Sequence, residues 1–163
     1  MRQVFFSFEY NKDNWRASQV RNMGKVSNDS TFSDNDWEEV KYKSKASIEQ
    51  WIKDQMKKRS CVIVLIGSTT YTRDWVKYEI QEAYNQNKGL VGIYIDKLED
   101  RNGKQTTRGN NPFDYVIDYK GEKLSKHVKT FDSVYLKSKN VYNDIADNIE
   151  DLIEEAINKA GTY

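Results

Sequence analysis

Residues 61–87 read CVIVLIGSTTYTRDWVKYEIQEAYNQN, and this stretch decides the fold. Its first six residues are apolar and rich in β-branched side chains, which predicts a short strand buried on both faces, as in a parallel sheet. Residues 67–70 favour a turn. Asp74 is a suitable N-cap, and the apolar side chains after it recur at helical spacing. The stretch is therefore a strand, a loop and a helix, and ligands of open α/β sheets bind at such loops.

The rest of the chain alternates between strands and helices in the same way. Further strands are expected at residues 3–8, 31–33, 90–95 and 131–136, and further helices at 14–23, 44–59 and 140–160. Alternation of this kind predicts an α/β, flavodoxin-like three-layer sandwich with a central, mainly parallel five-stranded sheet in the order 2-1-3-4-5. The length of the chain predicts a single domain over residues 1–163. Residues 61–66 are expected to form the central strand of its sheet.

Composition excludes several classes of protein. The 26 basic and 25 acidic residues are interspersed, so nucleic acid is not an expected partner. No apolar run approaches the ~20 residues of a membrane span, so no membrane association is expected. Cys61 is the only cysteine and lies in a predicted core strand, which favours the reducing cytoplasm. The chain also has a single histidine, His127. With one cysteine and one histidine, we expect no metal site built on these two residue types. His127 lies in a Lys-rich segment and is expected to be solvated.

Glu79 is the most unusual polar residue of the predicted helix. It lies at the boundary of the apolar face, and its neighbours one turn away include Trp75 and Glu82 but no cation. An aromatic neighbour and a second carboxylate both favour a raised pKa. The alternative on geometry alone is a solvated glutamate at the edge of the helix.

Four short motifs, in the right order, resemble known proteins. The sequence WVKYE at residues 75–79 after a buried strand resembles the third strand and helix of TIR domains, and VFFSF at 4–8 resembles their first strand. The sequences DWEE at 36–39 and GNNPFDY at 109–115 resemble the TIR-like proteins of the bacterial Thoeris antiphage system. The resemblance covers most of residues 2–115 and implies a single TIR-like domain. Residues 24–42 depart from it, because ordinary TIR domains have a clearer second strand there.

The resemblance implies an enzyme that consumes NAD. In enzymatic TIR domains the glutamate of the Trp-x-x-x-Glu motif is catalytic, which here is Glu79. A Thoeris protein of this kind would sense infection and convert NAD into a cyclic ADP-ribose-type second messenger that activates a separate effector. NAD would be a substrate, with no resident cofactor, and self-association is left open.

The stimulus that the resemblance implies is a phage-derived trigger, and the effector would respond to the small-molecule product rather than to the protein itself. Cleavage at the nicotinamide–ribose bond passes through an oxocarbenium-like transition state, which one carboxylate can stabilise. We expect Glu79 to be that carboxylate. The residues expected to bind the substrate are Phe6, Ser7, Phe8, Trp37, Ser68, Trp75 and Asn111.

Two other functions fit the same fold. One is a non-catalytic TIR-like adaptor that only assembles with other proteins, and the other is an enzyme similar to nucleoside deoxyribosyltransferases. A phospho-receiver and a flavodoxin are disfavoured, because the acceptor aspartate of the first and the glycine-containing phosphate loop of the second are missing. Residues 96–119 are expected to form either a lid that excludes water, with Phe113 and Tyr115 as stacking faces, or a surface loop pinned by Pro112 and Phe113.

Overall fold

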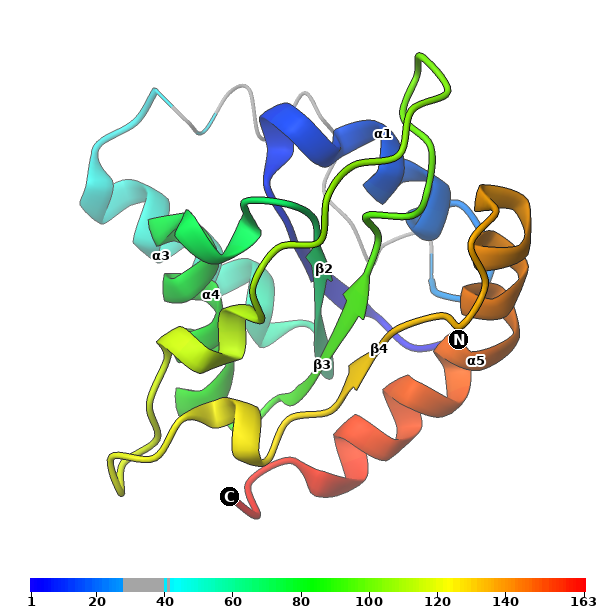
Figure 1. Cartoon of the computed structure of the whole chain (residues 1–163). Helices are drawn as coiled ribbons and strands as arrows, with labels where there is room; N and C mark the ends of the chain where they lie inside the picture. Colours follow the sequence, from blue (N-terminus) through cyan, green and yellow to red (C-terminus); the bar gives the residue numbers. More distant parts are fainter. Residues whose placement is uncertain (28–39, 41) are drawn as a thin grey trace.

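The computed structural model describes residues 1–27, 40 and 42–163, and its centre is a parallel sheet (Figure 1). Within the described residues the sheet has four strands in the order β1 (Val4–Ser7), β2 (Cys61–Ile66), β3 (Gly89–Tyr94) and β4 (Thr130–Phe131). Every neighbouring pair is parallel. All six residues of β2 are buried, which confirms the prediction of a central strand covered on both faces.

The predicted number of five strands is wrong for the described part of the chain, which contains four. The expected strand at residues 31–33 lies outside the described residues. The expected strand at 131–136 is reduced to β4, which ends at Phe131. Beyond it no regular strand continues: the backbone oxygen of Ser133 accepts a hydrogen bond from the side chain of Lys97, and Val134 is 85% exposed.

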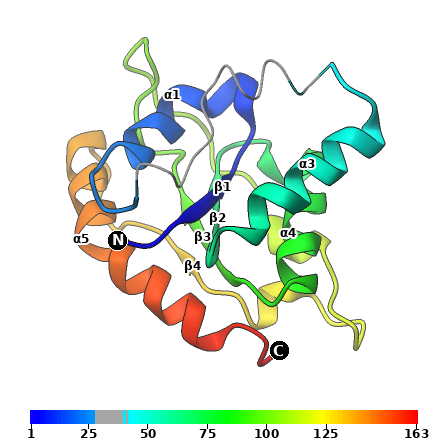
Figure 2. The same cartoon turned by 180° about the vertical axis from the view of Figure 1, so that it is seen from behind.

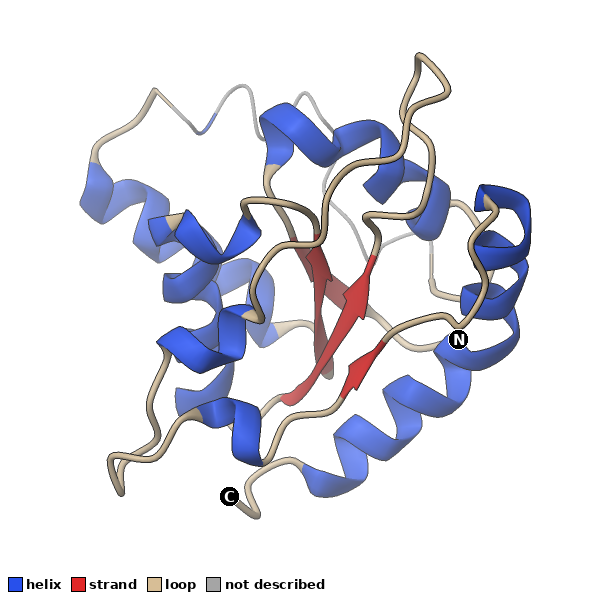
Figure 3. Cartoon of the chain, in the orientation of Figure 1, coloured by secondary structure: helices blue, strands red, loops and turns tan. Residues whose placement is uncertain are grey.

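Helices cover both faces of the sheet, as the three-layer prediction requires (Figures 2 and 3). On one face α1 (Tyr10–Arg21) and α5 (Ser138–Lys159) bury their apolar side chains against the sheet. On the other face α3 (Lys45–Lys57) and α4 (Asp74–Asn85) do the same. Among the described residues, no helix combines the length and the apolar character needed to cross a membrane.

The helix boundaries follow from local capping. Ser44 caps α3, since its side chain accepts a hydrogen bond from the backbone N–H of Ser47 at 3.2 Å. Asp74 is the first residue of α4 rather than its cap, which is Arg73. Helix α1 begins four residues earlier than predicted, because the bond from the N–H of Asp13 to the oxygen of Glu9, 2.9 Å long, continues the helical pattern back to the end of β1.

The segment after β3 returns across the carboxyl end of β2. A Cβ atom placed on Gly109 would lie 2.4 Å from the backbone oxygen of Gly67, so the two loops are in close backbone contact. The segment then forms the short helix η3 (Pro112–Tyr115), in which Phe113 is fully buried. The expectation that Phe113 offers a stacking face to a ligand is therefore wrong, because its ring fills the core beside α4.

Candidate active site

The carboxyl ends of β1 and β2 lie side by side, and they position a buried pair of polar side chains. Ser7 is the last residue of β1 and pairs in register with Val64. Successive side chains of a strand alternate between faces, so Ser7 points to the same side as Phe5, toward α4. There its Oγ donates a hydrogen bond of 2.8 Å to Oε1 of Glu79. The structure thus joins the two predicted site residues that are 72 positions apart.

Burial controls the electrostatics of Glu79. The residue is only 6% exposed, and this burial raises the pKa of its carboxyl from 4.5 to about 8, although the hydrogen bond from Ser7 opposes the rise. The predicted raised pKa is confirmed, but burial is its main cause rather than a neighbouring carboxylate. The alternative of a solvated glutamate at the helix edge is wrong, since β1 covers this side of α4.

Three more of the predicted residues lie on elements that surround this pair. Trp75 is half-buried in the first turn of α4 and meets the ring of Tyr78 edge-on, with ring centroids 5.7 Å apart. Ser68 is half-buried in the loop that follows β2. Asn111 caps η3, where its Oδ1 accepts a hydrogen bond from the N–H of Phe113 at 3.0 Å. Since η3 packs against α4, Asn111 comes from an element beside Glu79.

The two predicted phenylalanines lie elsewhere. Phe6 is 2% exposed and belongs to the core on the α1 and α5 side of the sheet, opposite to Glu79. Phe8 packs against the same core and carries the guanidinium of Arg21 5.4 Å above its ring. The structure does not bring either ring together with Glu79, because alternation along β1 directs them to the other face. Trp37 lies outside the described residues.

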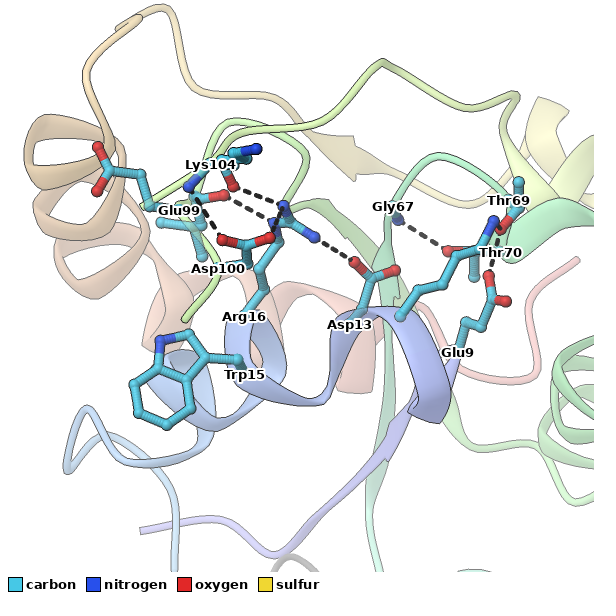
Figure 4. A network of polar contacts seen from close by, with 12 residues as sticks. Glu9, Asp13, Trp15, Arg16, Gly67, Thr69, Thr70, Glu99, Asp100 and Lys104 are labelled. Atoms are coloured by element: carbon cyan, nitrogen blue, oxygen red, sulfur yellow. Dashed lines mark hydrogen bonds and ion pairs between the residues drawn. The ribbon is translucent and has the colours of Figure 1, made fainter. Parts of the chain in front are cut away.

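A network of buried carboxylates at the same edge was not predicted (Figure 4). Glu9 lies two residues after the end of β1, is 6% exposed and accepts a hydrogen bond from the hydroxyl of Thr69, which also accepts one from Lys12. Asp13 lies one helical turn on and is 1% exposed. Its Oδ2 lies so close to Gly67 that a Cβ atom there would be 2.1 Å away. Glycine is therefore required after β2.

Arg16 connects this network to the segment after β3. Its guanidinium donates to Oδ1 of Asp13 at 3.0 Å and to the backbone oxygens of Leu98 and Lys104 at 2.8 and 2.7 Å. Burial raises the pKa of Asp13, while the bond from Arg16 opposes the rise. Figure 4 shows Arg16 between Asp13 on one side and Asp100 and Lys104 on the other, with the contacts of Glu9, Thr69 and Thr70 beside them. Arg16 thereby fixes the loop that contains Asp100 over the edge of the sheet.

The sequence contained a signal for this network. Glu9 and Asp13 are four residues apart, directly after a predicted strand, so a helix that began there would place both carboxylates on one face at the ligand-binding edge. The predicted start of this helix at residue 14 left both carboxylates outside it, whereas α1 begins at Tyr10. The carboxyl edge of the sheet therefore contains Glu79, which pairs with Ser7, and a separate network that contains Glu9, Asp13 and Arg16.

Comparison with known proteins identifies the family and agrees with the α/β fold. A family model described as "Thoeris protein ThsB, TIR-like domain" matches residues 5–100, which include α1, α3, β2, α4, β3 and all of β1 but its first residue. A protein of Bacillus cereus (strain MSX-D12), provisionally named cyclic ADP-D-ribose synthase ThsB1, is 34% identical over 120 residues. The match covers 71% of this chain and 62% of that relative. The chain therefore belongs to the Thoeris ThsB family of TIR-like proteins.

Proposed function

We propose that this protein cleaves the nicotinamide–ribose bond of NAD with Glu79 as the catalytic carboxylate, and that it releases a cyclic ADP-ribose-type messenger. The observation that carries the proposal is the buried pair of Ser7 and Glu79 at the carboxyl edge of a parallel sheet, where such folds bind ligands. The name of the Bacillus cereus relative, which describes synthesis of cyclic ADP-D-ribose, supports the same chemistry.

The reaction needs little from the protein besides charge and exclusion of water. In NAD the nicotinamide ring is a cationic pyridinium. When the bond from its nitrogen to the ribose breaks, the electron pair stays on the nitrogen and nicotinamide departs as a neutral molecule, so no general acid has to protonate it. Positive charge then develops on the ribose, and an ionised carboxylate nearby stabilises it. Glu79 has only Ser7 as a hydrogen-bond partner among the described residues, and that bond leaves its second oxygen for a ribose hydroxyl.

The protonation state of Glu79 links substrate binding to catalysis. With its pKa raised to about 8, the carboxyl holds its proton at neutral pH in the substrate-free protein. A cationic nicotinamide placed beside it favours the ionised form and lowers that pKa. Binding of NAD would therefore both ionise Glu79 and oppose the charge of the bound ring, and access to the buried carboxyl requires a local opening of the site.

Cyclisation requires that a nucleophile of the same ADP-ribose, rather than water, bonds to the ribosyl carbon and then loses a proton. The segment of residues 96–119 lies over this edge and is fixed there by Arg16 and by the contact between Gly109 and Gly67. A fixed cover of this kind excludes water and keeps the two ends of the substrate close together. The separate effector and the phage-derived trigger are parts of the proposal that rest on the family, and self-association is left open.

The test is product analysis. NAD is supplied to the purified protein, and extracts of phage-infected cells that express the protein are analysed in parallel, because infection supplies any trigger. Release of nicotinamide together with a product lighter than ADP-ribose by one water supports the proposal. Linear ADP-ribose as the sole product would overturn the cyclase part, and absence of nicotinamide release in both samples would favour the adaptor alternative.

A further inference from the structure

A second group of chemically competent side chains lies at the other end of the sheet, where β3 begins. Residues 116–124 form a small hairpin, in which Ile117 and Lys123 pair as an antiparallel bridge and the N–H of Asp118 bonds to the oxygen of Glu122 at 2.8 Å. The short helix η4 (Leu124–Lys126) follows and ends at His127. In Figure 1 this region is yellow and lies near the C-terminus, far from the labelled carboxyl end of β2.

Three side chains of this hairpin and η4 direct donor atoms to one point. The donor atoms of Asp118, Glu122 and His127 lie within 4.8 Å of one another. Nε2 of His127 is 3.6 Å from Oδ2 of Asp118 and 3.3 Å from Oε2 of Glu122. The turn holds Asp118 in place, since its Oδ1 accepts hydrogen bonds from the N–H groups of Lys120 and Glu122 at 2.8 and 2.9 Å.

Oδ2 of Asp118 is the independent observation that points to a ligand. The side chain of Asp118 is 1% exposed, and within the described part of the chain this oxygen has no hydrogen-bond partner. A buried carboxylate oxygen in that position is costly unless a cation or donor meets it. It faces the imidazole of His127, on the same side as the carboxylate of Glu122.

The distances from Nε2 of His127 to the two carboxylates are long for hydrogen bonds and fit a shared cation. An N–H···O hydrogen bond usually spans about 2.7–3.2 Å, and the single N–H of one imidazole nitrogen points in one direction only. Zinc with bonds of 2.0–2.2 Å at tetrahedral angles keeps neighbouring ligand atoms roughly 3.4 Å apart. The separations of 3.6 and 3.3 Å from Nε2 of His127 match the second spacing better than the first.

Aromatic stacking fixes the imidazole in this orientation. The ring of His127 is parallel to that of Tyr163, with centroids 5.8 Å apart and an angle of 2° between the planes. Tyr163 in turn stacks on Tyr84 of α4 at 6.4 Å. The hydroxyl of Tyr84 accepts a hydrogen bond from the N–H of Tyr119, in the same loop as Asp118. The donor atoms are thus arranged before any ligand arrives.

We propose that Asp118, Glu122 and His127 bind a zinc-type divalent cation. An imidazole nitrogen disfavours calcium and magnesium, which prefer oxygen ligands, and suits zinc. The side chains of His127 and Glu122 are 34% and 44% exposed, so water completes the coordination from the open side. The ion would join the hairpin to the end of η4, and it uses two carboxylates with one histidine, a donor set that a count of cysteine and histidine alone does not include.

The unique histidine makes the test direct. Zinc is titrated into tag-free protein that has been stripped with a chelator, and the two imidazole nitrogens are followed by long-range proton–nitrogen NMR. We expect the Nε2 signal to shift and saturate at one equivalent, with the proton retained on Nδ1 and a higher melting temperature. Magnesium at the same concentration should leave the imidazole signals unchanged. Absence of any shift at millimolar zinc would overturn the proposal and leave an ordinary ion pair.

Variants identify the carboxylate ligands. Glu122→Gln and Asp118→Asn should each weaken zinc binding by at least about tenfold, as judged by calorimetry. Asn at position 118 keeps the Oδ1 acceptor, and melting curves of the metal-free variants verify that they fold. Glu155→Gln is the matched control, because Glu155 pairs with Lys129 and Lys159 on the neighbouring surface, and its affinity should equal that of the unchanged protein. Equal affinity in both carboxylate variants would show that the histidine alone binds zinc and would overturn the site.

Discussion

Replacement of Glu79 by Gln should make the protein more stable at high pH. The folded protein keeps the proton of Glu79 up to about pH 8, whereas the unfolded chain releases it near the ordinary value of 4.5. Between these two values the folded state binds more protons than the unfolded state, so the free energy of unfolding falls as the pH rises. Gln removes this loss while its side-chain oxygen can still accept the hydrogen bond from Ser7.

The size of the effect follows from the shift in pKa. Each pKa unit corresponds to about 1.36 kcal/mol, so the loss attached to Glu79 reaches roughly 5 kcal/mol above pH 8. Most of that loss develops between pH 5 and pH 8. The difference in the free energy of unfolding between the Glu79→Gln variant and the unchanged protein should therefore increase by about 3–4 kcal/mol over this interval.

Urea unfolding at several pH values between 5 and 8 measures this difference. The slope of the free energy against urea concentration must be the same in both proteins, so that the comparison reports stability alone. Glu82→Gln, on the same helix, is the matched control for the loss of one glutamate. If this difference stays constant within about 0.5 kcal/mol across the pH range, Glu79 is not buried and protonated in the folded protein.

Two further predictions concern contacts of Gly109 and Arg16, and a third concerns the pH dependence of catalysis. Gly109→Ala should destabilise the fold by about 1–3 kcal/mol in urea unfolding, because the new Cβ meets the backbone of Gly67, and an unchanged stability would contradict that close approach. In urea unfolding Arg16→Gln should cost about 3–5 kcal/mol, since it leaves Asp13 buried without its cation, whereas Arg2→Gln breaks an exposed pair with Glu154 and should change stability much less. In steady-state kinetics kcat/KM for NAD should rise with pH toward a plateau above the free-protein pKa of about 8 for Glu79, and a flat profile from pH 6 to 9 would contradict the role of its ionised form.

The sequence predicted the central part of the fold because the signal there is local. In a strand, six consecutive apolar residues place apolar side chains on both faces, so both faces have to be covered. All six residues of β2 are buried. The edge of the sheet was less predictable. Residues 131–136 have strand-forming composition, but side-chain bonds from Lys97 and Arg108 hold Ser133 and Asp132 away from a regular strand. Contacts of this kind depend on residues far away in the chain.

The candidate site was predicted only in part, for the same reason. A helical projection places Glu79 at a boundary. It contains no information about Ser7, which covers Glu79 from strand β1. The assignment of Phe6 and Phe8 to the site overlooked the alternation of faces along β1, a signal present in the sequence. Asn111 precedes Pro112, and an asparagine in that context commonly caps a turn, as it does at η3.

The central claim is that Glu79 performs the chemistry, and nicotinamide release from NAD tests it most directly. The unchanged protein, Glu79→Gln and Glu82→Gln are compared under the conditions in which the unchanged protein is active, after melting curves have shown that all three fold. Glu79→Gln should lose roughly 10²–10³-fold in turnover or more, while Glu82→Gln retains it. Turnover by a folded Glu79→Gln variant at the rate of the unchanged protein would show that another residue performs the chemistry.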